Sequence, residues 1–202
     1  MKTIFIPAKV KASLNKEKIN SLSKKLPKNI AIAYSIQFKD LAEQVKSSIS
    51  NNITQITQVL GCSKPNFPKE TQAVLIIGSG RFHALALASE TSLPIYILER
   101  DKLSEISQKE IASFQKKKNT AYLKFLHADS LGILISTKPG QENLRKSLAL
   151  KNKIKDKTPY FFLSNNVNPP EFENFNLNAW VNTACPRLDM DSSPINIRDL
   201  DL

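Results

Sequence analysis

Cysteine, glycine and long hydrophobic runs are scarce in this sequence of 202 residues, and each scarcity narrows the class of protein. No run approaches the roughly 18 apolar residues that a membrane-spanning helix needs, so no membrane protein is expected. Met1 leads directly into the strand-like Thr3–Ile6 without the apolar core of a signal peptide, and the expected compartment is the cytoplasm. Two distant cysteines, Cys62 and Cys185, exclude a disulfide scaffold, so each is a buried thiol, a reactive thiol or a metal ligand.

Positive charge is in excess, with 29 Lys and Arg residues against 18 Asp and Glu residues and a formal net charge of +11. Such a charge attracts nucleic acid or an acidic surface. The lysines are scattered over Lys9–Lys28, Lys102–Lys118 and Lys146–Lys157, without interleaved aromatic residues or a groove-reading motif. A solvated lysine-rich surface is therefore favoured over a dedicated nucleic-acid site, and a basic nucleic-acid-binding α/β protein stays the alternative from a different class.

Short apolar runs recur along the chain, and their length and lack of alternation are typical of strands buried on both faces. They are Thr3–Ile6, Ile30–Tyr34, Thr57–Leu60, Ala73–Ile77, Ile95–Leu98, Leu131–Ser136, Tyr160–Leu163 and Trp180–Val181. Segments with helical periodicity lie between several of these runs, as the spacing of Leu41, Val45 and Ile49 indicates. Strand, helix and strand in this order predict parallel crossover units and an α/β fold.

Two halves of the chain share one pattern. Ile30–Ile49 and Gly132–Ile154 both read as an apolar strand, a serine-containing turn and a lysine-bearing amphipathic helix. The stretch Lys102–Asp129 between them predicts one or two helices with these side chains facing inward: Leu103, Ile106, Ile111, Phe114, Leu123 and Leu126. We therefore expect two related parallel-sheet α/β domains, 1–105 and 106–202, with the tail Asp189–Leu202 ordered as a strand or loop.

The run Ala73–Ile77 leads into a Gly-Ser-Gly turn and the small-residue helix Ala84–Ser89. Ligands of open parallel sheets bind at the carboxyl ends of the strands, where glycine lets the backbone approach them. The turn is a candidate cradle for a carboxylate or phosphate, although it lacks the third glycine of a dinucleotide fingerprint. Its candidate contacts are Gly78, Ser79, Gly80, Arg81 and His83. A tight turn with a solvated Arg81 explains the same residues equally well.

A second polar turn follows Leu131–Ser136, where Ser136 and Gln141 are candidate contacts to a polar ligand. The plainer alternative is that Ser or Thr caps the helix predicted at Glu142–Ile154.

Both cysteines directly follow apolar runs, in Gln58–Cys62 and in Val181–Cys185. A lone buried cysteine usually behaves as a small hydrophobic residue, whereas the exit of a strand is the usual place for a binding site, and both interpretations stay open. Trp180, just before the second cysteine run, is expected in the core. His127 is expected to be structural.

Four short motifs together resemble the archaeal diphthamide synthase family, the 2-(3-amino-3-carboxypropyl)histidine synthases. They occur in the family's order and span most of the chain: Gln58–Cys62, Gly78–His83, Ser136–Gln141 and Asn182–Arg187. The resemblance implies related α/β domains packed around a shared site, each of three domains supplying one cysteine to a [4Fe-4S] cluster. Cys62 and Cys185 match the second-domain and third-domain ligands, so the first domain of the family is expected to be absent.

The mechanism that the resemblance implies begins with reductive cleavage of the Cγ–S bond of S-adenosylmethionine at the cluster. The resulting 3-amino-3-carboxypropyl radical adds to the imidazole C2 of a histidine in translation elongation factor 2. Gly78–Gly80, Arg81, His83 and Gln141 are expected to hold the carboxylate and amine of the substrate. Arg187, beside the cluster, is expected to tune its potential.

Three thiolates hold such a cluster while its open iron receives S-adenosylmethionine, and this sequence contains two cysteines. We therefore hypothesise that the third comes from a separately encoded first domain, a paralogous subunit or a second copy in a homodimer. An electron donor is required in addition. The alternative within the same family is a non-catalytic or electron-relaying subunit of a heteromeric synthase.

Overall fold

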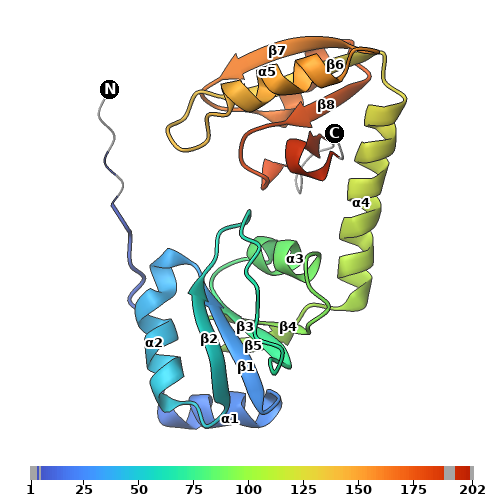
Figure 1. Ribbon diagram of the computed structural model, residues 1–202. Coiled ribbons are helices and arrows are strands. Elements are labelled where there is room, and N and C mark those ends of the chain that lie inside the picture. Colours follow the sequence, from blue (N-terminus) through green and yellow to red (C-terminus); the bar gives the residue numbers. More distant parts are fainter. Residues whose placement is uncertain (1–3, 5, 189–193, 201–202) are drawn as a thin grey trace. The chain divides into compact units, whose positions relative to one another are not determined.

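The structure, a computed structural model, describes residues 4, 6–188 and 194–200. The chain divides into two compact units, Met1–Ala112 and Ser113–Leu202, which we call unit 1 and unit 2. The division falls inside one continuous helix, α4 (Gln108–Leu126). Each unit has its own sheet and its own hydrophobic core, and Figure 1 labels their elements.

Unit 1 is built on a five-stranded sheet with the strand order β2-β1-β3-β4-β5. Its elements before α4 are α1 (Lys16–Lys25), β1 (Asn29–Tyr34), η1 (Ile36–Phe38), α2 (Lys39–Ser48), β2 (Asn52–Gln58), β3 (Ala73–Ile77), α3 (Phe82–Ala88), β4 (Ile95–Glu99) and β5 (Lys102–Glu105). Strands β1 to β4 pair in parallel, and β5 joins the edge antiparallel. After β1 the chain forms β2 on one side of β1 and then β3 on its other side. A topological switch point therefore lies between β1 and β3.

Both faces of the central strands of unit 1 are buried, as their unbroken apolar runs predicted. One face packs against α1 and α2 through Ile19, Leu22, Ile30, Ile32, Leu41, Val45, Leu75 and Ile77. The opposite face packs against α3 through Ala31, Ala33, Val74, Ile76, Ala84, Leu87 and Ala88. The carboxyl ends of β1 and β3 are thereby held rigidly, and the polar turns that follow them start from fixed positions.

Unit 2 is built on a four-stranded, fully parallel sheet with the order β7-β6-β8-β9. Its elements after α4 are β6 (Ser130–Ser136), α5 (Leu144–Lys153), β7 (Thr158–Ser164), η2 (Pro169–Asn174), β8 (Ala179–Asn182), β9 (Ile195–Asn196) and η3 (Ile197–Asp199). One face of the sheet packs against α4 and α5 through Ala121, Phe125, Leu131, Ile133, Ile135, Leu150, Ile154 and Val181.

The other face of the unit 2 sheet carries an aromatic cluster around Trp180 of β8. The Phe172 ring stacks on the indole with centroids 4.6 Å apart, and the Phe162 ring tilts against it at 4.8 Å. Gly132 of β6 pairs with Trp180, and a Cβ added at Gly132 would overlap the indole ring. Trp180 is therefore a core residue, as expected, and its close approach requires glycine on the neighbouring strand.

The two units share one topology, because β2-β1-β3-β4 in unit 1 corresponds to β7-β6-β8-β9 in unit 2. The similarity of Ile30–Ile49 to Gly132–Ile154 is confirmed, since the first segment forms β1 and α2 and the second lies in β6 and α5. The prediction of two related parallel-sheet α/β halves is thus confirmed. None of the described helices combines the length and the apolar character that crossing a bilayer requires.

Two predicted strands differ from the structure. Residues 3 and 5 of the strand predicted at Thr3–Ile6 lie outside the described residues, while Ile4 and Ile6 are both 84% exposed and belong to no strand. The strand predicted at Thr57–Leu60 is β2, which begins at Asn52. Polar Asn, Thr and Gln residues alternate with isoleucine in this edge strand, so an unbroken apolar run does not mark its start.

The stretch Lys102–Asp129 contains strand β5 and the single helix α4 rather than helices alone. Leu123 and Leu126 are 54% and 46% exposed, so their predicted inward positions are wrong. The buried residues of α4 are Ala121 and Phe125, which are four residues apart and share one face of the helix. Packing within unit 2 determines which face of α4 is buried. The apolar residues along α4 are compatible with more than one buried face, so their spacing alone did not identify it.

Two smaller differences concern the end of the chain. The helix predicted at Glu142–Ile154 is α5, and its N-cap residue is Asn143 rather than serine or threonine. In the tail predicted at Asp189–Leu202, residues 189–193 and 201–202 lie outside the described residues, and the remainder forms β9 and η3. The expected ordered strand is therefore present in the described part of the tail.

The Gly132 contact provides a test of the unit 2 core. Replacing Gly132 with alanine forces the added methyl group against the indole of Trp180, which two phenylalanine rings hold in place. We expect Gly132→Ala to lower the free energy of unfolding by about 1–3 kcal/mol in urea titrations. Gly78→Ala is the control, because a Cβ there meets only the Ser35 hydroxyl at 3.3 Å and the expected loss is smaller. Equal stability of the parent and Gly132→Ala chains would contradict this packing.

Candidate functional site

Cys62 lies in a turn of the connection between β2 and β3. The Leu60 amide donates to the Ser63 hydroxyl at 2.7 Å, and the Ser63 amide donates back to the Leu60 carbonyl at 3.0 Å. This pair of hydrogen bonds closes the turn around Gly61 and Cys62. The Cys62 side chain is partly buried and forms no disulfide.

The Gly78–His83 segment reaches the Cys62 turn through Phe82. The Phe82 ring lies against the backbone of Gly61, where an added Cβ would overlap the ring. The half-buried His83 packs edge-on against the same phenylalanine, with ring centroids 5.2 Å apart. Two of the four motifs, Gln58–Cys62 and Gly78–His83, are therefore in contact within unit 1.

The backbone amides of the Gly-Ser-Gly turn are partly engaged within the unit. The Gly78 amide donates to the Leu98 carbonyl at 3.4 Å, and the Gly80 amide donates to the Glu99 carboxylate at 3.1 Å. Gly80 has a φ of +77°, a conformation that favours glycine. Ser79 is exposed at the tip of the turn. The roles predicted for Gly78, Ser79 and Gly80 stay predictions.

Arg81 is directed toward the first turn of α4. Its guanidinium pairs with the Glu110 carboxylate at 2.7 Å, and both side chains are more than one third exposed. Glu110 also accepts from the amide and the hydroxyl of Ser107 at 2.9 and 2.7 Å, while the Ser107 hydroxyl accepts from the Glu110 amide at 3.3 Å. This reciprocal arrangement is a capping box at the start of α4. The guanidinium of Arg81 is thus engaged by the Glu110 carboxylate.

A pocket of about 240 Å³ lies at the carboxyl ends of the unit 2 strands, and four predicted site residues line it: Ser136, Gln141, Cys185 and Arg187. The motifs Ser136–Gln141 and Asn182–Arg187 therefore meet, as Gln58–Cys62 and Gly78–His83 do in unit 1. Lys138, Asn165 and Val167 also line the pocket. These three were not among the predicted site residues, although Asn165 directly follows β7, and the end of a strand was the signal that located the other candidates.

Among the described residues that line this pocket, the charged side chains are those of Lys138 and Arg187, and both are cationic. Amide side chains of Gln141 and Asn165 add hydrogen-bonding groups, and Val167 contributes an apolar wall. Ser136 is 2% exposed, and its hydroxyl accepts from the Lys138 amide at 3.1 Å, which is a contact within the turn. The pocket suits an anionic group, such as a carboxylate, beside the Cys185 thiol.

The two cysteines follow strands that do not correspond in the two units. Cys62 follows β2, the second strand of unit 1, whereas Cys185 follows β8, the third strand of unit 2. The Gly78–His83 turn, after β3, occupies the position in unit 1 that Asn182–Arg187 occupies in unit 2. Both cysteines lie after strands, as predicted, but these strands hold different places in the order of their units.

Within the described residues, no group of three His, Cys, Asp or Glu side chains is arranged to hold a metal ion. Each unit contributes one cysteine, and thiolates are the donors that iron–sulfur clusters bind. The thiol of each cysteine therefore has the donor chemistry of a cluster ligand.

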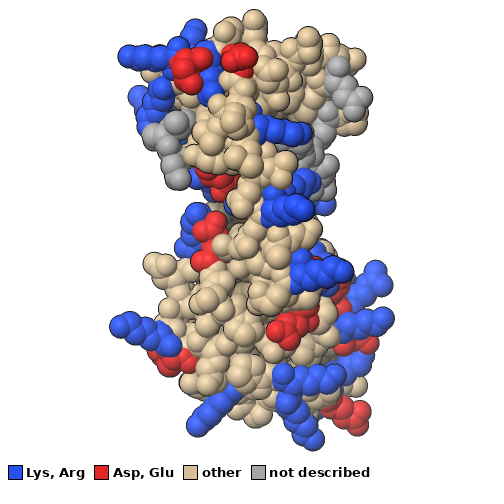
Figure 2. Space-filling model, turned by 90° about the vertical axis from the view of Figure 1, so that its right-hand side faces the viewer, with Lys and Arg blue, Asp and Glu red and all other residues tan. Residues whose placement is uncertain are grey.

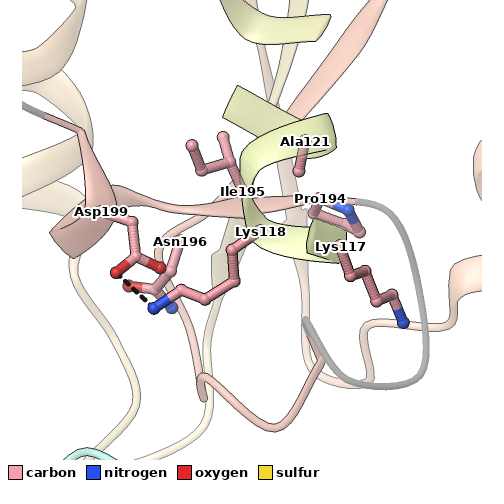
Figure 3. Close-up of a pocket in the computed structure, with 7 residues that line it drawn as sticks. All are labelled: Lys117, Lys118, Ala121, Pro194, Ile195, Asn196 and Asp199. Atoms are coloured by element: carbon pink, nitrogen blue, oxygen red, sulfur yellow. Dashed lines mark ion pairs between the residues drawn. The ribbon is translucent and has the colours of Figure 1, made fainter. Parts of the chain in front are cut away.

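A second, smaller pocket of about 10 Å³ lies between α4 and the segment β9–η3, and Figure 3 shows its lining residues. Lys118 of α4 pairs with Asp199 at 2.8 Å, which ties the C-terminal segment to the helix. Within the described residues, Nδ2 of the buried Asn196 has no hydrogen-bond partner, and the space suits one water molecule. None of the predicted site residues lines this pocket.

The basic residues do not gather into one patch on the face that Figure 2 draws. Lys and Arg side chains lie there among uncharged surface and alternate with Asp and Glu side chains. His127, just after α4, is exposed, and its amide donates to the Leu123 carbonyl.

Two parallel α/β units, each with a thiol and polar turns at the carboxyl ends of its strands, define an α/β protein of the ligand-binding type. The sequence model of one family, described as "Putative diphthamide synthesis protein", matches residues 1–194. The chain belongs to this family.

Relatives and solved structures agree with that assignment. The chain is 28% identical over 205 aligned residues to the 2-(3-amino-3-carboxypropyl)histidine synthase of Pyrococcus horikoshii, covering 94% of this chain and 60% of that protein. It is also 28% identical to the enzyme of the same name from Methanocaldococcus jannaschii, covering 95% and 57%. A crystal structure of Dph2 from Pyrococcus horikoshii with a 4Fe-4S cluster matches with a TM-score of 0.73 and 26% identity, covering 91% of this chain and 59% of that one. The chain thus spans about 60% of the length of the first of these relatives.

The contact between Gly61 and Phe82 provides a test of the unit 1 site. Gly61→Ala places a methyl group inside the volume of the Phe82 ring, so we expect it to lower the thermal midpoint and to accelerate alkylation of Cys62. In a chain that already carries Phe82→Ala, the methyl group of Gly61→Ala has no ring to overlap. The changes in the thermal midpoint and in the alkylation rate should then be smaller. A double-mutant cycle measures the coupling, and additive effects of the two changes would show that the residues are not in contact.

The capping box at Glu110 predicts a pH dependence. The Ser107 hydroxyl and amide, and then Arg81, lower the pKa of the Glu110 carboxyl below its ordinary value. A carboxyl group whose pKa is lowered on folding stabilises the folded state at pH values above its pKa in the unfolded chain. This stabilisation is lost as the pH falls through the pKa of the group in the folded state. Glu110→Gln should therefore reduce the free energy of unfolding by at most about 1 kcal/mol near neutral pH.

In acid the Glu110→Gln and parent chains should become equally stable, as measured by urea unfolding across the pH range. The exposed Glu43→Gln on α2 is the control. A difference between Glu110→Gln and the parent that is constant with pH would mean that the carboxylate charge plays no part.

Proposed function

We propose that this chain is part of a 2-(3-amino-3-carboxypropyl)histidine synthase. The enzyme transfers the 3-amino-3-carboxypropyl group of S-adenosylmethionine to a histidine of translation elongation factor 2, the first step of diphthamide biosynthesis. The observation that carries the proposal is the presence of a thiol at a strand exit in each of two parallel units, inside the motifs of the family. The names of the archaeal relatives and the 4Fe-4S cluster in the similar Dph2 structure support it.

In this proposal Cys62 and Cys185 bind the [4Fe-4S] cluster as two of its thiolate ligands. Domains 1–105 and 106–202 correspond to the second and third domains of the family. A third thiolate, where the cluster takes three, comes from outside these 202 residues, because the sequence has two cysteines. Its source is a further domain, a paralogous subunit or a second copy of the chain.

The chemistry that a cluster supplies when bound is reduction of the sulfonium by one electron, which releases the transferred group as a radical. An electron donor provides that electron. The residues of this chain have the task of binding and orienting the substrate and keeping water from the radical. In unit 2, Lys138 binds the carboxylate of the methionine moiety, and Gln141 and Asn165 donate or accept hydrogen bonds at its amine and carboxylate. Arg187 lines the same pocket as Cys185, and its charge tunes the potential of the cluster.

The unit 1 residues contribute a second set of contacts in this proposal. Ser79 is exposed at the tip of its turn and offers a hydroxyl, while His83 lies against Phe82 beside the Cys62 turn. Arg81 binds a substrate carboxylate only after leaving Glu110. Gly78 and Gly80 act mainly by shaping the turn, because their amides already have acceptors.

A non-catalytic or electron-relaying subunit is the second candidate, and the number of cysteines is the observation that favours it. Such a subunit holds part of a cluster site and stabilises its partner. It differs from the first candidate in one measurable respect, because the modification of elongation factor 2 then tolerates the loss of Cys62.

Iron content tests the proposal directly. After anaerobic reconstitution with its partner polypeptide, the parent chain should contain iron and acid-labile sulfide, and Cys62→Ala and Cys185→Ala should each remove most of both. Ser48→Ala, an exposed change at the end of α2, is the control and should leave the iron content unaltered. Unchanged iron in both cysteine variants would overturn the cluster assignment. A complete and stable cluster on the isolated chain would exclude a partner as the source of the third thiolate.

A further inference from the structure

The segment Asn182–Cys185 is bound to unit 2 by a buried network of polar side chains. Thr183, 1% exposed, donates from its hydroxyl to the Leu134 carbonyl of β6 at 2.7 Å. Its own carbonyl accepts from Nδ2 of Asn143 at 2.7 Å, and its hydroxyl accepts from the Ser147 hydroxyl at 3.1 Å. The residue between β8 and the cysteine turn is thus joined both to the central strand and to the start of α5.

Asn182 connects this anchored position to the cysteine. It is the last residue of β8, its exposure is 0%, and its side chain binds two peptide groups of the turn that follows. Oδ1 accepts from the Ala184 amide at 2.8 Å, and Nδ2 donates to the Cys185 carbonyl at 2.9 Å. Only an amide side chain has an acceptor and a donor in this arrangement. If the amide group were rotated by half a turn, its NH2 donor would face the Ala184 amide donor.

The Cys185 carbonyl has a second partner, because it also accepts from the Leu188 amide at 3.2 Å. Pro186 restricts Cys185 to extended backbone conformations from the other side. With its carbonyl directed into the protein, Cys185 presents its side chain to the pocket that Ser136 and Arg187 also line. These contacts define one conformation of the cysteine peptide before any ligand is present.

We infer that Asn182 is a positioning residue, which holds the Cys185 peptide so that the thiol is presented to the unit 2 pocket. The inference rests on the proposed function for the identity of the ligand that the thiol binds. The geometry of the Cys185 peptide does not depend on that function. A buried asparagine serves this purpose better than a serine or a leucine. Serine does not reach both peptide groups. Leucine leaves the partly buried Ala184 amide without its acceptor, and leaves the Cys185 carbonyl with the Leu188 amide alone.

Asn196 provides a matched comparison within the same sheet. It ends β9, pairs in register with Asn182, is 4% exposed, and accepts from the Arg198 amide at 3.1 Å, two residues along the chain. The two asparagines therefore share strand position, burial and the local turn. They differ in two respects. No cysteine follows Asn196 in its turn, and within the described residues Nδ2 of Asn196 has no partner, whereas Nδ2 of Asn182 donates to the Cys185 carbonyl.

The test measures alkylation of each cysteine by iodoacetamide in the full 202-residue chain, followed by mass spectrometry of the Cys62 and Cys185 peptides. Asn182→Leu removes both hydrogen bonds, and Asn182→Asp keeps the acceptor and removes the donor. We expect both variants to change the alkylation rate of Cys185 by about fivefold or more, the equivalent of one net hydrogen bond. The rate at Cys62, in the other unit, should stay unchanged.

Asn196→Leu is the control for simple loss of stability. It should lower the thermal midpoint as Asn182→Leu does, while the rate at Cys185 stays within about twofold of the parent, a small change for one hydrogen bond. An unchanged Cys185 rate in both Asn182 variants, or an equal change in Asn196→Leu, would overturn the inference. Because alkylation needs no cluster, this outcome is distinguishable from a failure of the iron measurement. Asn182→Asp keeps the test informative if Asn182→Leu does not fold.

Discussion

The hydrogen bonds of a buried parallel strand end where the strand ends, and the backbone beyond that point needs new partners. In unit 2 the chain leaving β8 finds them in Asn182 and Asn143, whose side chains bind peptide groups between Thr183 and Cys185, while the Thr183 hydroxyl donates to the Leu134 carbonyl of β6. In unit 1 the chain leaving β2 finds them in Ser63, whose hydroxyl closes the turn around Cys62. The conformations of both cysteine turns therefore depend on short polar side chains that replace the sheet.

The same requirement explains why the polar residues of this protein occur where they do. Thr183 and Asn182 are nearly or fully buried, and burying a hydroxyl or an amide is favourable only when its hydrogen bonds are made. At each strand exit these bonds are made to the backbone of the turn, so burial and turn shape support each other. A turn held in this way presents a thiol or a cation at a defined position, which is what a binding site requires.

The common topology of the two units accounts for a further property of the site. The strand order brings the connections after the first, second and third strands to one edge of each sheet. In unit 1 the contact through Phe82 joins the turns after β2 and β3, and in unit 2 the pocket joins residues that follow β6, β7 and β8. The same topology is therefore compatible with a cysteine after the second strand in one unit and after the third strand in the other.

The sequence by itself determined the α/β class, the duplication and the positions of most central strands, because unbroken apolar runs such as Ala73–Ile77 reflect burial on both faces. It also determined the four motifs and both cysteines. It did not determine the start of the edge strand β2, because this strand is rich in polar residues. It also did not determine the buried face of α4, because the apolar residues of this long helix are compatible with more than one buried face. Only the tertiary structure decided that Lys138 and Asn165 line the pocket and that Asn182 binds the Cys185 peptide. These contacts depend on the distances between turns that follow different strands, and distances between separate segments are a property of packing rather than of local sequence.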